Sequence, residues 1–244
     1  MINKFQNVVD NVDQLDDLNE SKKSVRELLP EGTAIVQLVR YIEVGIQNNR
    51  PIQGKAKAPT NQCYIGVNII GGGSKKGNEP FQPYCKDGKP IPLYSSFAID
   101  ISQNEKARYF NTFKAFNYAG TARHFVQLLG TIALLKIGVK VEGDKSYQEF
   151  DLRSVTAPTK DAMSGTVYEA GKDGVLDSPD EDYQCFIWDM PDQSQWDSIF
   201  IDGEYEREVN GTKTMVSKNK FQELIQNANN FIGSPTEALL MGVS

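Results

Sequence analysis

The feature that most constrains the fold of this chain is a set of segments in which apolar residues recur at every second position. One of them, QCYIGVNII at residues 62–70, has Cys63, Ile65, Val67 and Ile69 at alternate positions. This period is that of a β-strand with one buried face. Similar β-rich runs occur elsewhere, and Gly- or Pro-containing loops separate several of them. The predicted strands span residues 33–44, 62–70, 93–101, 131–141 and 147–155.

Between the third and fourth predicted strands the apolar period becomes helical. Ser102 or Asn104 is placed to cap a helix through EKARYFNTFKAFNY, and a shorter helical stretch, ARHFVQLL, follows and ends at Gly130. The order β-β-β-α-β-β across residues 33–156 is that of an OB-fold, a five-stranded Greek-key barrel. We therefore predict a mainly β (α+β) chain whose OB-fold barrel carries a helical insert between strands three and four.

Changes in pattern along the chain divide it into three predicted regions. Residues 1–30 are polar and acidic and predict an N-terminal arm, residues 31–160 hold the predicted barrel, and residues 161–244 form an acidic C-terminal extension. The extension contains an aromatic and acidic stretch around two tryptophans. It is also predicted to contain a helix through SKNKFQELIQNANNFIG, which Ser217 caps and Gly233 ends.

Charge is unevenly distributed along the chain, which carries −6 in total. Residues 31–160 contain 17 Lys and Arg against 10 Asp and Glu, a balance of +7. Residues 161–244 contain five cations against 16 acids, a balance of −11. This asymmetry suggests a polyanion partner for the middle of the chain, although +7 over that length also fits a chance excess.

Several classes of protein are disfavoured by what the sequence contains. No apolar run approaches the length of a membrane span, and the N-terminus does not resemble a secretory signal. Three cysteines without close spacing indicate a reduced, cytoplasmic chain. The one histidine, His124, lies in an apolar context, and GGGSKKG departs from the phosphate-binding loop pattern. We therefore expect no enzyme, no cofactor and no metal site.

The cations and aromatic residues of the middle region suit single-stranded nucleic acid. Proteins that bind it combine a positive groove with aromatic faces on which bases stack. In an OB-fold, ligand lies across strands two and three, between the loop joining strands one and two and the loop joining strands four and five. The first of those loops here is purely basic, with Arg50, Lys55 and Lys57. The candidate nucleic-acid-binding residues are Arg40, Tyr41, Arg50, Lys55, Lys57, Tyr64, Lys75, Lys76, Phe81, Tyr84, Lys86, Lys89, Lys136, Lys140, Tyr147 and Arg153.

Three stretches carry a family resemblance: VRYIEVGIQNNRPIQGKAKAP, NEKARYFNTFKAFNY with HFVQLLG, and FIWDMPDQSQWDSIFIDG. They resemble a family of tailed-bacteriophage proteins regarded as OB-fold single-stranded DNA-binding proteins. The resemblance covers roughly residues 30–205, and its motif falls on Tyr41 to Lys57. It implies an accessory of DNA replication or recombination that coats single strands in the host cytoplasm and recruits partners. Unlike the usual acidic tail, the acid here is internal, with 14 acids against two cations over residues 161–210.

Three functions stay open on the sequence. The first is sequence-independent binding and protection of single-stranded DNA, with the acidic C-terminal part competing for the groove, or residues 161–210 holding a replication or recombination protein. The second is a phage structural or protein-interaction module, in which the segment from Trp188 to Trp196 forms an interface. The third is an enzyme such as a metal-dependent nuclease, which requires clustered carboxylates. We expect the first.

Overall fold

One long strand, β1 (Gly32–Gln47), organises the sheet of this protein. It pairs antiparallel along its length with β2 (Thr60–Gly73), and its first half also pairs antiparallel with β5 (Ile132–Glu142). Its second half pairs in parallel with β9 (Gln184–Phe186), so the C-terminal part of the chain adds a strand to the sheet. The computed structural model describes residues 28–29, 31–51, 54–73, 88–94, 98–143, 145–161, 163–209 and 212–242.

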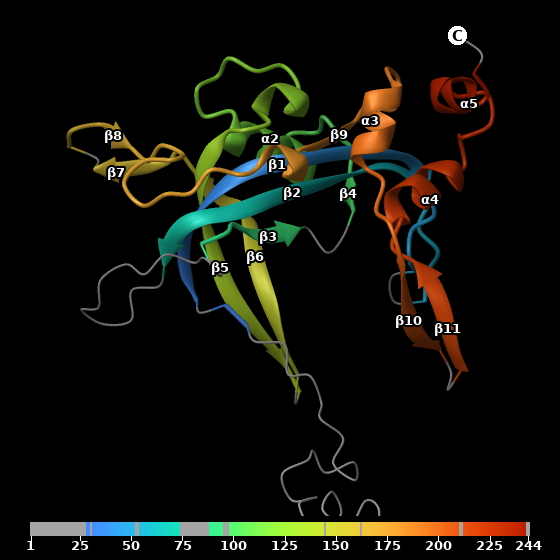
Figure 1. The fold of residues 1–244 in the computed structure, drawn as a ribbon, viewed down its shortest axis with the longest axis horizontal. Helices are drawn as coiled ribbons and strands as arrows, with labels where there is room; N and C mark the ends of the chain where they lie inside the picture. Colours follow the sequence, from blue (N-terminus) through green and yellow to red (C-terminus); the bar gives the residue numbers. More distant parts are fainter. Residues whose placement is uncertain are drawn as a thin grey trace, which may run out of the picture.

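The remaining strands of the sheet lie outside β2 and β5. β3 (Ile91–Tyr94) and the two-residue β4 (Ile99–Asp100) pair with β2, and β6 (Lys145–Thr156) pairs with β5, which gives the order β3-β2-β1-β5-β6 (Figure 1). Within the described residues, no pairing joins β3 to β6, and the sheet is not a closed barrel. The prediction of a mainly β (α+β) chain is confirmed.

The helical insert is real, but it begins later than predicted. α2 (Arg108–Phe116) has Ala107 at its N-cap position, with no side-chain cap. Asn104 instead accepts a hydrogen bond from the backbone N–H of Lys106 at 2.9 Å, within a turn that precedes the helix. The short stretch that follows is the 3-10 helix η3 (Phe125–Leu128), which the His124 side chain caps.

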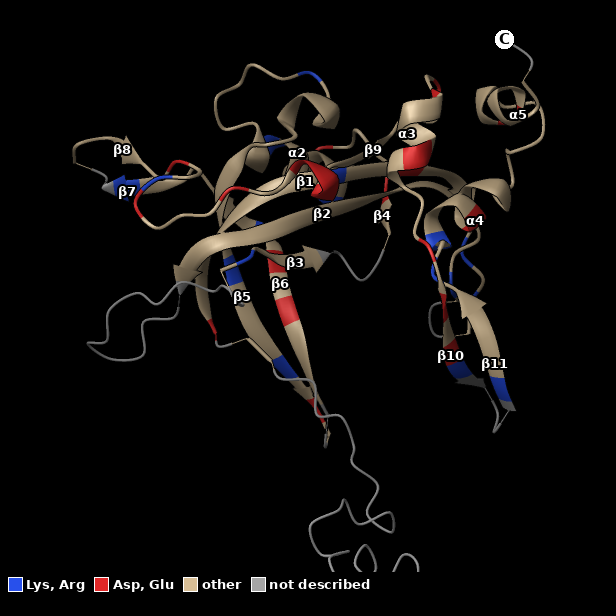
Figure 2. Cartoon of the chain, in the orientation of Figure 1, with Lys and Arg blue, Asp and Glu red and all other residues tan. Residues whose placement is uncertain are grey.

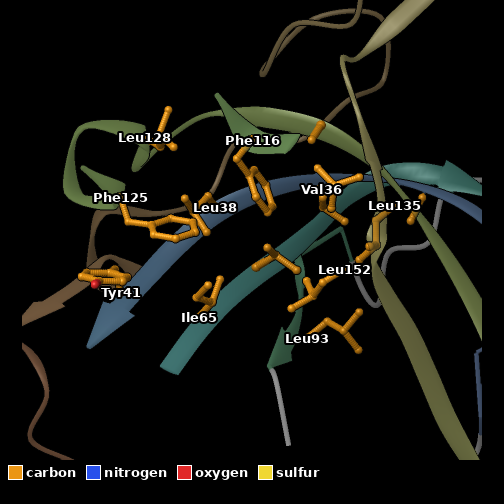
Figure 3. Packing of buried hydrophobic residues seen from close by; sticks show 14 of the residues in the cluster. Val36, Leu38, Tyr41, Ile65, Leu93, Phe116, Phe125, Leu128, Leu135 and Leu152 are labelled. Atoms are coloured by element: carbon orange, nitrogen blue, oxygen red, sulfur yellow. The ribbon is translucent and has the colours of Figure 1, made fainter. Parts of the chain in front are cut away.

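The inner core lies between the sheet and these two helices (Figure 3). The alternating residues of β1, β2 and β5 supply most of it, as their period requires. Phe116 of α2 and Phe125 of η3 are fully buried against the sheet, so these two aromatic residues serve as core. Figure 3 shows this packing for Val36, Leu38, Tyr41, Ile65, Leu93, Phe116, Phe125, Leu128, Leu135 and Leu152.

A second core joins the C-terminal part to the opposite side of the sheet. Ile42 and Val44 of β1 pack there with Phe186, Trp188 and other residues of the C-terminal part. The helix predicted between Ser217 and Gly233 is shorter: α4 spans Lys220–Gln226, follows Asn219, and ends before the glycine. The other C-terminal elements are β7 (Thr159–Asp161), β8 (Thr166–Val167), η4 (Asp180–Asp182), α3 (Gln193–Ser198), β10 (Glu204–Val209), β11 (Thr212–Ser217) and α5 (Pro235–Leu240).

The structure has two long hairpins. β5 and β6 form one within the large sheet, and β10 and β11 form a separate two-stranded sheet in the C-terminal part; both extend downwards in Figure 1. The predicted N-terminal arm lies outside the described residues except for Leu28 and Leu29. Among the described residues, no helix has the length and apolarity needed to span a membrane.

Candidate nucleic-acid interface

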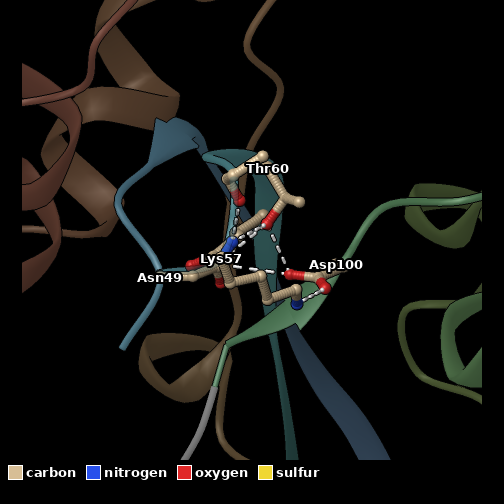
Figure 4. Close-up of polar contacts among 6 residues, drawn as sticks. Asn49, Lys57, Thr60 and Asp100 are labelled. Carbon is tan, nitrogen blue, oxygen red and sulfur yellow. Dashed lines mark hydrogen bonds and ion pairs between the residues drawn. The ribbon is translucent and has the colours of Figure 1, made fainter. Parts of the chain in front are cut away.

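The basic loop between β1 and β2 is attached to β4 by a polar cluster (Figure 4). The Asp100 carboxylate accepts hydrogen bonds from Lys57 Nζ at 2.6 Å, Thr60 Oγ1 at 2.6 Å and Gln62 Nε2 at 3.2 Å. Asn49 completes the cluster, because its Nδ2 donates to Thr60 Oγ1 and its Oδ1 accepts from Gln62. These bonds fix both ends of the loop next to the sheet.

The same cluster sets the charge of Asp100. Partial burial acts to raise its pKa, but the hydrogen bonds from Lys57, Thr60 and Gln62 and the charge of Lys57 hold it below the usual value. The charged carboxylate therefore stabilises the fold at neutral pH, and this contribution is lost as pH falls from the ordinary Asp range, about 4, through the lowered pKa. Lys57 is accordingly a neutralised cation and not a free one.

Next to this cluster lies a pocket of about 610 Å³ that reaches from the loop to the start of α2. Its charged lining residues are three cations, Lys57, Lys106 and Arg108, and one acid, Asp100. The full lining is Asn49, Lys57, Gln62, Ala98, Ile99, Asp100, Ser102, Asn104, Lys106, Ala107 and Arg108. The pocket is therefore a positively charged surface built on β4 and on the turn before α2.

A second pocket, of about 760 Å³, continues this surface onto β6. It shares Lys106 and Arg108 with the first and adds Arg153, with Glu149 and Asp151 as its acids. Arg153 Nε donates to Asp151 Oδ1 at 3.1 Å. Burial acts to raise the pKa of Asp151, but the bonds from Arg153 and the charges of Arg153 and Arg108 lower it overall. We name Lys57, Lys106, Arg108 and Arg153 the cationic rim.

Two residues of the cationic rim, Lys106 and Arg108, are absent from the sequence prediction. Both are exposed, and both line the two pockets. The sequence predicts both residues within a helix, whereas Lys106 lies in the turn and Arg108 is the first helical residue. The signal available in the sequence is the KAR run at residues 106–108, near the start of the predicted helix, where a cation is unusual.

The structure places Tyr41 and Arg40 away from solvent. Tyr41 is fully buried, and its hydroxyl donates to Glu43 Oε1 at 2.8 Å while lying 3.0 Å from the Tyr109 hydroxyl. Burial and the neighbouring Cys63 and Glu43 raise the pKa of Tyr41, so it stays protonated. Its ring stacks on Phe125 and offers no free face to a base. Arg40 is also buried, with its guanidinium over the ring of Phe221.

Replacing Tyr41 with phenylalanine is expected to reduce stability without changing any binding of nucleic acid. The change removes the donor to Glu43 Oε1, while Oε2 keeps its bond from the backbone N–H of Trp188, so urea unfolding should show a loss of about 1–3 kcal/mol. The matched variant Tyr205→Phe, at an exposed tyrosine of β10, should stay within about 0.5 kcal/mol of the parent. Lost binding with unchanged stability would show that Tyr41 reaches the ligand.

Tyr64 is half-buried under the C-terminal part. Its ring meets the edge of Phe221 at a centroid distance of 5.2 Å, and Lys220 Nζ lies 5.7 Å from its centroid. Burial raises its pKa, which the charge of Arg50 partly offsets. Because α4 provides both neighbours, Tyr64 is a packing residue in this structure.

The remaining predicted residues are distributed around the sheet (Figure 2). Arg50, Lys55, Lys89 and Lys136 are exposed, and Lys140 is paired with Glu142 at 2.6 Å near the tip of the β5–β6 hairpin. Figure 2 shows acids on β6 beside the cations of β5, so the hairpin is mixed in charge. Tyr147 is exposed on that hairpin. The predicted residues outside the described part of the chain are Lys75, Lys76, Phe81, Tyr84 and Lys86.

The C-terminal part covers the face of β1 and β2 opposite the inner core. Asn68 is fully buried there and donates to Ser178 Oγ and Asp182 Oδ2 at 3.1 and 2.6 Å. Gln37 donates to Asp177 Oδ1 at 3.0 Å, and Val175 packs on Ile70. The face of β2 on which the ligand was expected is therefore covered by residues 175–182 of the C-terminal part.

Comparisons with known proteins found no matching protein-family model, no matching curated protein and no matching solved structure. Within the described residues, no three His, Cys, Asp or Glu side chains are grouped so that they could hold a metal ion. The geometry of the exposed charges therefore carries the functional argument.

Proposed function

We propose that this protein binds single-stranded DNA without sequence preference, through the cationic rim and the basic loop beside it. The observation that carries the proposal is that Lys106 and Arg108 line two adjoining pockets between Lys57 and Arg153. Lys57 and Arg153 are paired with acids, whereas Lys106 and Arg108 form no ion pair among the described residues, and such cations neutralise phosphates without reading bases. The wider role we propose is protection of single strands during DNA replication or recombination, as a tailed-bacteriophage single-stranded DNA-binding protein.

The order of strands supports an OB-fold as part of this proposal. The order β3-β2-β1-β5-β6, with α2 between the third and fourth strand regions, fits a Greek-key barrel left open between β3 and β6. In this arrangement the rim runs from the β1–β2 loop through β4 and α2 to β6. The proposed path for DNA therefore follows β4, α2 and β6, on the side where the barrel is open between β3 and β6. The C-terminal part covers the other face of β2.

The test is fluorescence anisotropy of the full chain with labelled oligo-dT and with a matched duplex, each at low and moderate salt. Tight binding to the single strand, weaker binding to the duplex and a steep loss with salt are expected. No binding to either at low salt would reject the proposal. The role of residues 161–210 in holding a replication or recombination protein belongs to the same proposal and requires a pull-down with the full chain.

The alternative of a protein-interaction module depended on the segment from Trp188 to Trp196. Both tryptophans are buried in the second core, where Trp196 meets Phe186 edge to face at 5.8 Å. Their main contacts are therefore within this chain, and no specific contact favours the alternative.

Replacing Asp100 with asparagine is expected to strengthen DNA binding, because the change releases Lys57 from its ion pair. Affinity for oligo-dT should rise about threefold to tenfold, and the salt slope should steepen by about one. Asp173→Asn is the matched control, since Asp173 pairs with Lys160 at 2.8 Å and neither residue lines the rim pockets. Equal effects of the two changes would mean that net charge and not Lys57 is responsible.

A further inference from the structure

A second group of cations lies on the covered face, where α4 meets β1 and β2. Lys220, the first residue of α4, has its Nζ 4.7 Å from the centroid of Phe221 and 5.7 Å from that of Tyr64. The Arg40 guanidinium lies over Phe221 from the β1 side, at 4.9 Å. Lys220 of the acidic C-terminal part therefore places positive charge over two aromatic rings, Tyr64 of β2 and Phe221 of α4 itself.

The charges in this group are alike. Partial burial and then the charge of Arg40 lower the pKa of Lys220, and the charge of Arg50 acts on the Tyr64 hydroxyl from the loop side. Among the described residues, neither Lys220 nor Arg50 forms an ion pair with an acid. Both side chains are exposed. Cations held together in this way attract an anion, because the anion relieves their mutual repulsion.

This group adjoins the end of the cationic rim. Asn49 and Gln62 line the first rim pocket, and each precedes a member of the group, Arg50 by one residue and Tyr64 by two. Gln62 and Tyr64 share a face of β2, since side chains two apart point the same way and lie about 7 Å apart. Arg50 therefore follows a rim-pocket residue directly along the chain, and Lys220 lies beside Tyr64 of the adjoining strand.

We infer that Lys220 and Arg50 form a phosphate-binding site that extends the cationic rim onto α4, so that the C-terminal part contributes a DNA contact. The ligand is the phosphodiester backbone and not a base, because Phe221 and Lys220 cover the Tyr64 ring. This inference rests on the proposed binding of single-stranded DNA. It assigns α4 a role opposite to the competition expected from the charge of residues 161–244.

The test compares Lys220→Glu and Lys220→Gln with Lys218→Glu in the full chain, using anisotropy with oligo-dT over a range of salt. Lys218 is exposed two residues earlier and lies beside Gly203, so it matches the charge change without facing Tyr64. Lys220→Glu should weaken binding about tenfold and reduce the salt slope by about one, with Lys220→Gln intermediate. Lys218→Glu should stay within about twofold of the parent, because it lies outside the group.

The outcomes separate this inference from the proposed function. If the parent chain does not bind oligo-dT, the proposed function fails and the site fails with it. If the parent binds and both Lys220 variants bind as it does, or lose no more than Lys218→Glu, the site on α4 is overturned while the rim stands. Thermal unfolding followed by circular dichroism checks the fold, and Lys220→Gln decides the result if the glutamate variant is unfolded.

Discussion

Replacing Lys106 and Arg108 together with glutamate is expected to abolish most binding of single-stranded DNA. Both residues line both rim pockets, so the double change reverses the charge at the centre of the proposed path. Affinity for oligo-dT at moderate salt should fall about 100-fold, and the salt slope should fall by about two. Anisotropy titrations at several salt concentrations measure both quantities.

The matched control for this variant changes the same charge elsewhere. Lys160 of β7 is paired with Asp173 and Lys172 is paired with Glu169, and neither lysine lines the rim pockets. The double variant Lys160→Glu, Lys172→Glu should lose only the small affinity that net charge explains. If the two double variants lose affinity equally, binding is a property of overall charge, and the cationic rim has no special part in it.

Substituting alanine for Gly45 is expected to destabilise the whole protein. Gly45 has φ +72°, and a Cβ there would lie 2.4 Å from Trp188 Cζ3 and 2.8 Å from Asn230 Oδ1. The Trp188 ring is buried in the second core and Asn230 accepts from the backbone N–H of Ile46 at 2.7 Å, so neither moves freely. The free energy of unfolding in urea should fall by about 3 kcal/mol or more, from backbone strain and overpacking together.

Gly233 provides the control that separates these two causes. Its φ is +79°, close to that of Gly45, but a Cβ there would have no atom within 4 Å. Gly233→Ala should therefore cost only the strain of the left-handed conformation, about 1–2 kcal/mol. A loss at Gly45 no larger than that at Gly233 would mean that the Trp188 contact does not hold the C-terminal part on the sheet.

The strands were predictable because each buries one face, and that leaves a period of two in the sequence. Residues 62–70 show this directly, since Cys63, Ile65, Val67 and Ile69 all reached the inner core. The pairing of β9 with β1 was not predictable, because three residues of a short strand carry no period. Helix starts were misplaced where a polar turn, as at Asn104, offers the same hydrogen-bonding residues as a cap.

The candidate site was only partly predictable for a related reason. Sequence shows which residues carry charge, but not which of them an acid neutralises or which the rest of the chain covers. Lys57 was predicted and is paired with Asp100, a residue 43 positions away. Tyr64 was predicted on an outward face and lies under α4, whose Phe221 follows it by more than 150 residues. Both outcomes depend on contacts between distant parts of the chain, which no local pattern records.

The pairing of β1 with β9 has a consequence for how the chain is made. Arg40 to Ile42 leave the ribosome early, but their partners Gln184 to Phe186 follow about 140 residues later, a delay of about 7–30 s at ordinary rates of synthesis. Throughout that interval the second half of β1 has an open edge and the apolar residues Ile42 and Val44 uncovered. This half-strand is therefore where a growing chain is most open to mispairing with its neighbours or to capture by a chaperone.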